Sequence, residues 1–186
     1  ADVSAHRGPL TLGLCVMDCL PHRPPGRISK QVPQHEEAIV RLTELQEMDE
    51  VEAAQSLLVR MLSIDEASFC NIFPYAHPQT LQTADIMGRT LLHYAAALGK
   101  LSALSLLLTC DSLDPNARDD VGDTALHLAA GNGERGTCEL LVGHPRVDRT
   151  LQDDDGKTAL DVAHSAAAHY FATEAVHALS KSAVAA

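Results

Sequence analysis

Residues 119–133 read DDVGDTALHLAAGNG, and the same pattern occurs twice more in the chain. It reads DIMGRTLLHYAAALG from residue 85 and DDDGKTALDVAHSAA from residue 153. The copies align without gaps, because the steps from 85 to 119 and from 119 to 153 are both 34 positions. A fixed period of this length predicts a stack of similar supersecondary units.

The three copies share a frame of five positions. These positions are Asp85, Asp119 and Asp153; Gly88, Gly122 and Gly156; Thr90, Thr124 and Thr158; Leu92, Leu126 and Leu160; and Ala95, Ala129 and Ala163. His93 and His127 also coincide, whereas the third copy has Asp161 at that place. Paired leucines follow in the first two copies, at residues 106–107 and 140–141.

This frame resembles the ankyrin repeat, whose pattern D-x-x-G-x-T-P-L-H-x-A-A-x-x-G precedes an outer helix that ends in paired leucines. The resemblance covers about residues 85–180. Leu91, Ala125 and Ala159 stand where the family often has proline. The third copy lacks the histidine, the second alanine and the closing glycine, as is normal for a terminal repeat that faces solvent.

The resemblance implies an all-α fold, an ankyrin-repeat solenoid of stacked helix-turn-helix repeats. The three repeats are expected at residues 85–118, 119–152 and 153–186. Residues 35–84 are expected to form a helical N-terminal cap or degenerate repeat with a loop insertion. Residues 1–34 are expected to be an extended tail or linker, loosely ordered or dependent on a partner.

The shared residues have structural roles of their own. The glycines are expected in turns, where a residue without Cβ takes a positive φ, and the threonines are expected as helix N-caps. Asp161 lies three residues after Thr158 and can reach back to its backbone, as in a capping box. His93 and His127 are expected to form local hydrogen bonds, and the small alanines let neighbouring helices approach closely.

The stretch DDDGKT at residues 153–158 imitates two ligand-binding loops. A phosphate-binding loop needs a glycine five residues before Gly156, but that residue is Leu151. A calcium-binding EF-hand loop needs acidic residues at 151 and 162, which are Leu151 and Val162. The stretch is therefore interpreted as a repeat turn with a structural role.

No metal, cofactor or catalytic group is predicted. Cys15 and Cys19 have His22 nearby, but no second ligand pair follows at the distance of a zinc finger. His93 and His127 occupy the same place in two repeats, which favours turn-stabilising histidines over metal ligands. The chain is accordingly predicted not to be an enzyme, because no nucleophile and base occur in a supporting local sequence.

Helical patterns also occur before the repeats. HEEAIVRLTELQEM (35–48) and DEVEAAQSLLVRML (49–62) each place apolar residues on one face, and Asp49 is the expected N-cap of the second helix. The two together form either a degenerate ankyrin helix pair or a plain helical hairpin that docks on the first repeat. Residues 64–73 are expected as a short helix, and residues 74–84 as a proline-containing insertion.

Composition limits the function classes. The net charge of −11 argues against nucleic acid as a partner, because phosphate binding needs a cationic face. No apolar run reaches the length of a transmembrane helix, so membrane insertion is not expected. Five cysteines at irregular spacing suit free thiols in a reducing compartment, so the expected location is cytoplasmic, with the nucleus possible.

The resemblance implies a concave surface of turn tips and first helices that binds other proteins. The residues expected to make these contacts vary between copies while the frame stays constant. They are Ile86, Met87, Arg89, Leu98, Asp120, Val121, Asp123, Asn132, Asp154, Asp155 and Lys157.

Six aspartates crowd the second and third turns, at positions 119, 120, 123, 153, 154 and 155. Turn tips of a solenoid line up along one edge, so these charges predict an acidic rim and a partner protein with a basic segment. Two function classes remain open. The chain is either a non-catalytic interaction module, as a scaffold or subunit of an assembly, or the regulatory ankyrin segment of a larger enzyme, kinase or channel.

Overall fold

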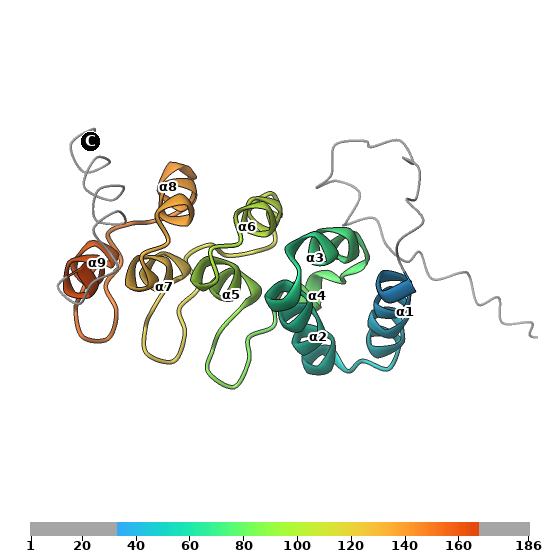
Figure 1. The fold of residues 1–186 in the computed structure, drawn as a ribbon. Coiled ribbons are helices and arrows are strands. Elements are labelled where there is room, and N and C mark those ends of the chain that lie inside the picture. Colours follow the sequence, from blue (N-terminus) through green and yellow to red (C-terminus); the bar gives the residue numbers. More distant parts are fainter. Residues whose placement is uncertain (1–32, 168–186) are drawn as a thin grey trace, which may run out of the picture.

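The computed structural model describes residues 33–167, which form a row of helices (Figure 1). The N-terminal elements are α1 (Pro33–Glu47), α2 (Val51–Ile64), α3 (Glu66–Ile72), the 3-10 turn η2 (Phe73–Tyr75) and α4 (Pro78–Gln82). The repeats contribute α5 (Leu91–Ala97), α6 (Leu101–Leu108), α7 (Ala125–Asn132), α8 (Arg135–Gly143) and α9 (Ala159–Ala167). Residues 1–32 of the expected tail and residues 168–186, which include the whole second half of the third repeat, lie outside the described residues.

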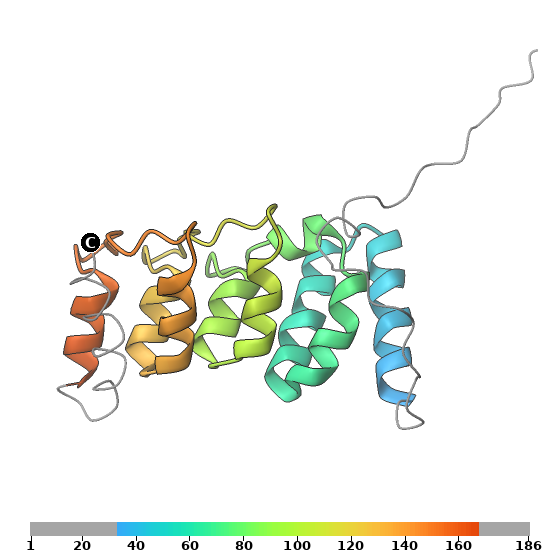
Figure 2. The ribbon, with the colours of Figure 1, turned by 90° about the horizontal axis from the view of Figure 1, so that it is seen from above.

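The repeat helices form two layers. The inner helices α5, α7 and α9 lie side by side, α6 and α8 lie behind them, and the turns project away from the outer layer (Figures 1 and 2). Ala95, Ala129 and Ala163 are fully buried, one in each inner helix. Their small side chains allow the inner helices to pack closely. The two-layered stack of helices confirms the predicted all-α ankyrin solenoid. None of the helices within residues 33–167 is both long enough and apolar enough to cross a membrane.

The inner helices begin and end where the repeat frame predicts. Thr90 and Thr124 are the N-cap residues of α5 and α7, with the extended backbone that this position requires. Gly99 and Gly133 follow the last turns with φ angles of +66° and +74°. Glycine tolerates this left-handed conformation, so each helix stops there and the chain reverses into the outer helix.

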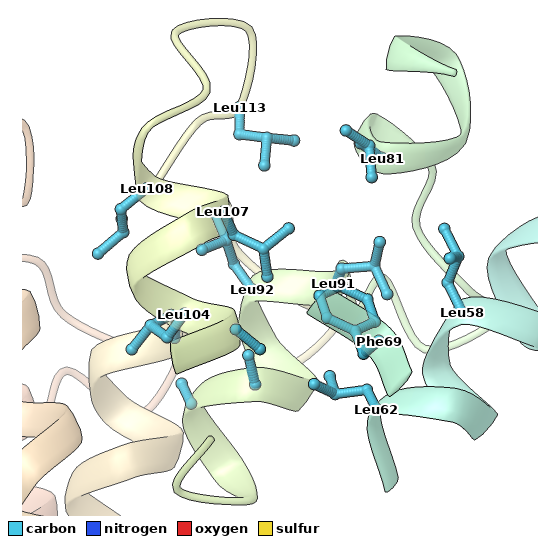
Figure 3. Close-up of a cluster of buried hydrophobic side chains, with 14 of the residues drawn as sticks. Leu58, Leu62, Phe69, Leu81, Leu91, Leu92, Leu104, Leu107, Leu108 and Leu113 are labelled. Carbon is cyan, nitrogen blue, oxygen red and sulfur yellow. The ribbon is translucent and has the colours of Figure 1, made fainter. Parts of the chain in front are cut away.

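Leucine and phenylalanine side chains join the N-terminal helices to the first repeat (Figure 3). Leu58 and Leu62 of α2 and Phe69 of α3 are fully buried with Leu91 and Leu104 of the first repeat. Helix α2 packs on α5 and α3 packs on α6, just as α5 packs on α7 and α6 on α8. The helix pair that continues the stack is therefore α2–α3. Of the two alternatives for residues 35–62, this packing argues against the degenerate ankyrin pair and agrees with a helical hairpin that docks on the first repeat through α2. The division of the chain at residues 34 and 84 stays a prediction.

One local expectation in this region is wrong. Asp49 is not an N-cap, because it adopts a φ of +59° in the turn between α1 and α2, and Glu50 precedes the first helical residue. The proline-containing insertion at 74–84 stays a prediction, and the structure places the short helix α4, which begins with Pro78, within it. Proline suits the first position of a helix, where its missing N–H costs no hydrogen bond.

We expect Thr137→Val to raise the free energy of unfolding by about 1 kcal/mol. Thr137 lies in α8 with 1% of its surface exposed, and its hydroxyl has no hydrogen-bond partner among the described residues. Valine has nearly the same shape and removes this polar burial. Urea unfolding followed by circular dichroism measures the change, and a clear loss of stability would show that the hydroxyl has a partner in solution.

Candidate protein-binding surface

Each repeat begins with a turn organised by its aspartate. In the second repeat, Oδ1 of Asp119 accepts hydrogen bonds from the backbone N–H groups of Val121 (3.1 Å) and Asp123 (2.9 Å). The backbone N–H of Asp119 also donates to the carbonyl of Asp123 at 2.9 Å. Asp85 makes the same contacts in the first turn, and Oδ1 of Asp153 accepts from Lys157 N–H in the third. The side chains of the frame aspartates therefore hold the turns together through hydrogen bonds.

Successive turns are joined backbone to backbone. The N–H of Asp120 donates to the carbonyl of Met87 at 3.0 Å, and the N–H of Asp154 donates to the carbonyl of Val121 at 3.2 Å. Gly122 lies at the second joint, with a φ of +81° and its hydrogen atoms facing Asp154. The three turn tips consequently form one hydrogen-bonded edge.

The two histidines link each inner helix to the following turn. Nδ1 of His93 accepts from the Thr90 backbone N–H at 3.0 Å, and the Thr90 hydroxyl lies 2.9 Å from the same atom. Because Nδ1 accepts, the ring proton is on Nε2, which donates to the carbonyl of Asp123 in the next repeat at 3.2 Å. His127 makes the equivalent bonds to Thr124 and to the carbonyl of Lys157. The local hydrogen bonds were expected, but the bond to the next repeat was not.

Asp161 replaces the histidine in the third repeat. Its carboxylate accepts from the backbone N–H of Thr158 at 2.9 Å and from the Thr158 hydroxyl at 2.6 Å, so the predicted reach back to Thr158 is confirmed. These bonds to Thr158 hold the pKa of Asp161 below its usual value. A carboxylate has no proton to donate onward, so this turn lacks the group that would hold a further repeat in the same way.

We expect His93 to titrate below the ordinary histidine range. Burial lowers its pKa by disfavouring the charged ring, and this outweighs the Asp123 carbonyl and the nearby Asp119 carboxylate, which raise it. The unfolded chain, with a histidine pKa of about 6.5, then binds more protons than the folded chain below that pH. The stability that His93 contributes is therefore present above about pH 6.5 and is lost as the pH falls from there towards its folded pKa.

An NMR titration of the His93 ring measures this directly, and a pKa at or above the ordinary value would contradict the expectation. A titration that resolves this one residue is needed, because Asp123 changes the free energy of unfolding with pH in the opposite direction. Burial and the neighbouring Asp119 and Asp153 raise its pKa, although His127 and Arg89 lower it. His93→Gln, which has no titrating group, serves as the control for the dependence of unfolding on pH.

The residues predicted to contact a partner lie on the turn tips and at the ends of the inner helices. Most of them are exposed, namely Ile86, Met87, Leu98, Asp120, Val121, Asn132, Asp154, Asp155 and Lys157. Arg89 and Asp123 are half-buried. The exposed fraction is 97% for Ile86, which is extreme for an isoleucine, and 56% for Val121.

The charges of this surface are partly neutralised inside the structure. Asp119 is buried, and its carboxylate lies 3.2 Å from Nε of Arg89 in the preceding turn. The expectation that Asp119 belongs to an exposed acidic rim is therefore wrong. Arg118 donates to Asp154 at 2.9 Å, and Lys157 lies 2.9 Å from Asp155. Asp120 is exposed and has no ion-pair partner in the described part of the chain.

Sequence reasoning missed Leu101, which is 43% exposed and lies close in the chain to Leu98. It is the first residue of α6 and packs beside Gly136 of α8, where an added Cβ would approach its Cδ1 atom to 3.1 Å. The sequence did indicate that this leucine is exposed, because Leu101 stands where the second repeat has the charged residue Arg135. The surface therefore has more apolar character than the predicted residues alone indicate.

Within residues 33–167, no group of three His, Cys, Asp or Glu side chains is arranged to hold a metal ion. Cys15, Cys19 and His22 lie outside the described residues. Cys70 and Cys138 are free thiols, and burial raises the pKa of the Cys138 thiol to about 12, which keeps it protonated and unreactive.

Comparison with known proteins agrees with the geometry. A family model described as "Ankyrin repeats (3 copies)" matches residues 92–183, and no curated protein matches the chain significantly. Ankyrin repeats are generally protein–protein interaction modules, and such domains are typically non-catalytic. The aspartate turns, the Thr–His links and the buried alanines are the features this match predicts, and the chain belongs to the ankyrin-repeat family through the repeats at residues 92–183.

Proposed function

We propose that this chain is a non-catalytic interaction module, a scaffold or subunit of an assembly, and that it binds a partner protein through its turn tips. The observation that carries the proposal is that, in the first two turns, the residues that hold the stack together are different from the residues exposed at the tips. The frame residues make the hydrogen bonds that hold the stack, whereas Ile86, Met87, Asp120 and Val121 are exposed and make no side-chain hydrogen bond or ion pair within the described residues. Exposed side chains that make no contact holding the stack together are available to bind a partner.

The chemistry of the tips changes along the stack. The first tip presents Ile86 and Met87, the second presents Asp120 and Val121, and the third presents Asp154 and Asp155. A partner segment with apolar residues over the first tip and basic residues over the second and third would match this order. The half-buried carboxylate of Asp123 supports the basic end, because burial raises its pKa and a nearby cation would relieve that cost.

The proposed compartment is the cytoplasm, with the nucleus as the alternative. The free thiols of Cys70 and Cys138 support a reducing environment.

Affinity purification from a cell extract with three forms of the chain tests the proposal. The first form is wild type, and the second carries Ile86→Ser and Val121→Ser at the tips. The third carries Met48→Ser and Tyr75→Ser, two positions that precede the repeats and are exposed like those at the tips. Proteins retained by the wild type and the third form but lost from the second are direct partners of the tips. If every retained protein survives the tip substitutions, the turn tips are not the binding surface.

We expect the double substitution Asp120→Lys with Asp154→Lys to slow association with a basic partner while leaving the fold intact. Surface charges act over about 8 Å at physiological salt, so they influence the encounter more than the final complex. The measurement is the association rate at several salt concentrations. Wild type should slow as salt rises, and the double variant should be slower at low salt and nearly independent of salt.

The matched control is Glu52→Lys with Glu139→Lys, two exposed helix positions that change the net charge by the same amount. If the control slows association as much as the tip variant, attraction comes from net charge rather than from the tips. Equal rates for wild type and tip variant at low salt would exclude an acidic rim altogether.

A further inference from the structure

The described part of the chain has a second open surface, a groove of about 810 Å³ at the end opposite the third repeat. The residues that line it come from α1, from α2 and from the junction of α2 with α3. Figure 1 shows how these three helices are arranged. The main contacts of helix α1 are with α2, α3 and η2, in the part of the structure that precedes the repeats. The groove is therefore separate from the turn tips and from the proposed function.

The groove has apolar walls. Val40 of α1 and Ile64 of α2 are 54% and 69% exposed at its rim, and Leu57 and Met61 of α2 are half-buried in its floor. Exposed branched side chains on facing helices leave apolar surface in water, which is unfavourable unless something covers it. The walls thus favour an apolar occupant.

The groove also carries unpaired charge. Arg60 lines it from α2 and has no ion-pair partner within residues 33–167, and neither does Glu37 on the α1 side. Glu36 is the acidic residue of the first turn of α1. An occupant with one acidic residue for Arg60 and basic residues near the start of α1 would satisfy these charges.

A segment with these properties precedes α1 in the same chain. Residues 9–20 read PLTLGLCVMDCL, in which eight of twelve residues are apolar and Asp18 is the only charge. The residues that connect it to α1 include Arg23, Arg27 and Lys30. The order along the chain is therefore apolar with one acid, then basic, then the acidic start of α1.

The connection between residues 9–20 and α1 is long enough to reach the groove and short enough to keep the segment close to it. Residues 21–32 are 12 residues that can span up to about 40 Å when extended and average about 20 Å when flexible. From Glu37 to Glu44 the α1 wall runs about 11 Å, at 1.5 Å per helical residue. A tether of this length reaches every part of the groove and holds the segment at an effective concentration of about millimolar.

We propose that residues 9–20 bind in the groove between α1 and α2, with Asp18 facing Arg60 and the basic connection facing Glu36 and Glu37. The segment covers Val40 and Ile64 and removes its own apolar side chains from water. The groove is then occupied within the chain, and a competing apolar segment must displace residues 9–20 to enter it.

Cross-linking from the native cysteines of the segment tests this in the full chain. Val40→Cys places a thiol at the groove, and Val121→Cys places one at the second turn tip with nearly the same exposure, 54% against 56%. Each variant is treated at low concentration with a short bis-maleimide, and peptides that join position 40 or 121 to Cys15 or Cys19 are quantified by mass spectrometry. We expect at least a tenfold or so greater yield at position 40, as a high local concentration requires.

Further variants make the test specific. Arg60→Glu should reduce the yield at position 40, and Asp18→Lys in addition should restore it. Leu12→Asp with Leu14→Asp should abolish it, while circular dichroism confirms that the helices persist. Ile64→Cys provides a second groove position should Val40→Cys alter the helical signal.

Equal yields at positions 40 and 121, or a yield unchanged by the leucine substitutions, would overturn the proposal. Cross-links that join two chains, and whose share rises with protein concentration, would overturn it in favour of a second copy as the occupant.

Discussion

Ala129→Glu is expected to lower the free energy of unfolding by about 3–5 kcal/mol, as an unpaired buried charge does. Ala129 is fully buried in α7, which packs against α5 on one side and α9 on the other. The equivalent Ala95 and Ala163 are also fully buried, so the neighbouring helices leave no room for a longer side chain. The glutamate must either stay protonated, push the helices apart or unfold the repeat.

Urea unfolding of the variant, followed by circular dichroism, measures the loss. Ala67→Glu is the matched control, because Ala67 is an exposed residue in the first turn of α3, where an acidic side chain is tolerated. The control should change stability by no more than about 0.5 kcal/mol. A fully helical Ala129→Glu protein with an unaltered transition would mean that position 129 is not in the stack and that the repeat register is wrong.

The repeat register was predictable because each frame residue does its work locally. An aspartate that binds backbone N–H groups two and four residues on, and a threonine that precedes a helix, leave a signature within one repeat. Asp161 shows how far this reasoning reaches, since its capping contact with Thr158 follows from a spacing of three residues. The exposure of most predicted contact residues has the same origin, because turn tips project from the stack.

Contacts between repeats were not predictable in this way. Asp119 reads as a solvated charge, but the structure buries it against Arg89, 30 positions earlier in the chain. The contacts of the Arg146 guanidinium, on the side of the outer helices, could not be predicted from a single repeat either. The guanidinium donates to four backbone carbonyls at and beyond the C-terminal end of α6, those of Leu108, Cys110, Asp111 and Leu113. Such partners depend on how neighbouring repeats stack, which no single repeat encodes.

The N-terminal helices mark another limit. Apolar spacing predicted α1 and α2 to within a few residues, but periodicity does not say which two helices continue the stack. The α2–α3 pair does so because Leu58 and Phe69 meet the first repeat. The turn at Asp49 and the groove beside Val40 follow from that arrangement, so neither could be inferred from the pattern alone.

The joints between turns provide the second large expected effect, in which Gly122→Ala costs about 3 kcal/mol and Gly156→Ala only about 1–2 kcal/mol. Both glycines have left-handed backbones, with φ angles of +81° and +77°, so both substitutions pay the same conformational strain. Their surroundings differ. A Cβ atom on Gly122 would lie 2.7 Å from the backbone nitrogen of Asp154 and 2.5 Å from its Oδ1, whereas one on Gly156 meets nothing within 4 Å among the described residues.

The extra cost at Gly122 therefore measures the joint itself. To accommodate the methyl group the third turn must move away, which breaks the Asp154 N–H bond to the Val121 carbonyl and separates Arg118 from Asp154. Paired urea unfolding of the two variants gives the difference, and hydrogen exchange at the Asp154 amide should quicken only in Gly122→Ala. Equal losses of stability with unchanged exchange at Asp154 would show that the two turns are not joined in solution, and that the tips do not present one continuous edge to a partner.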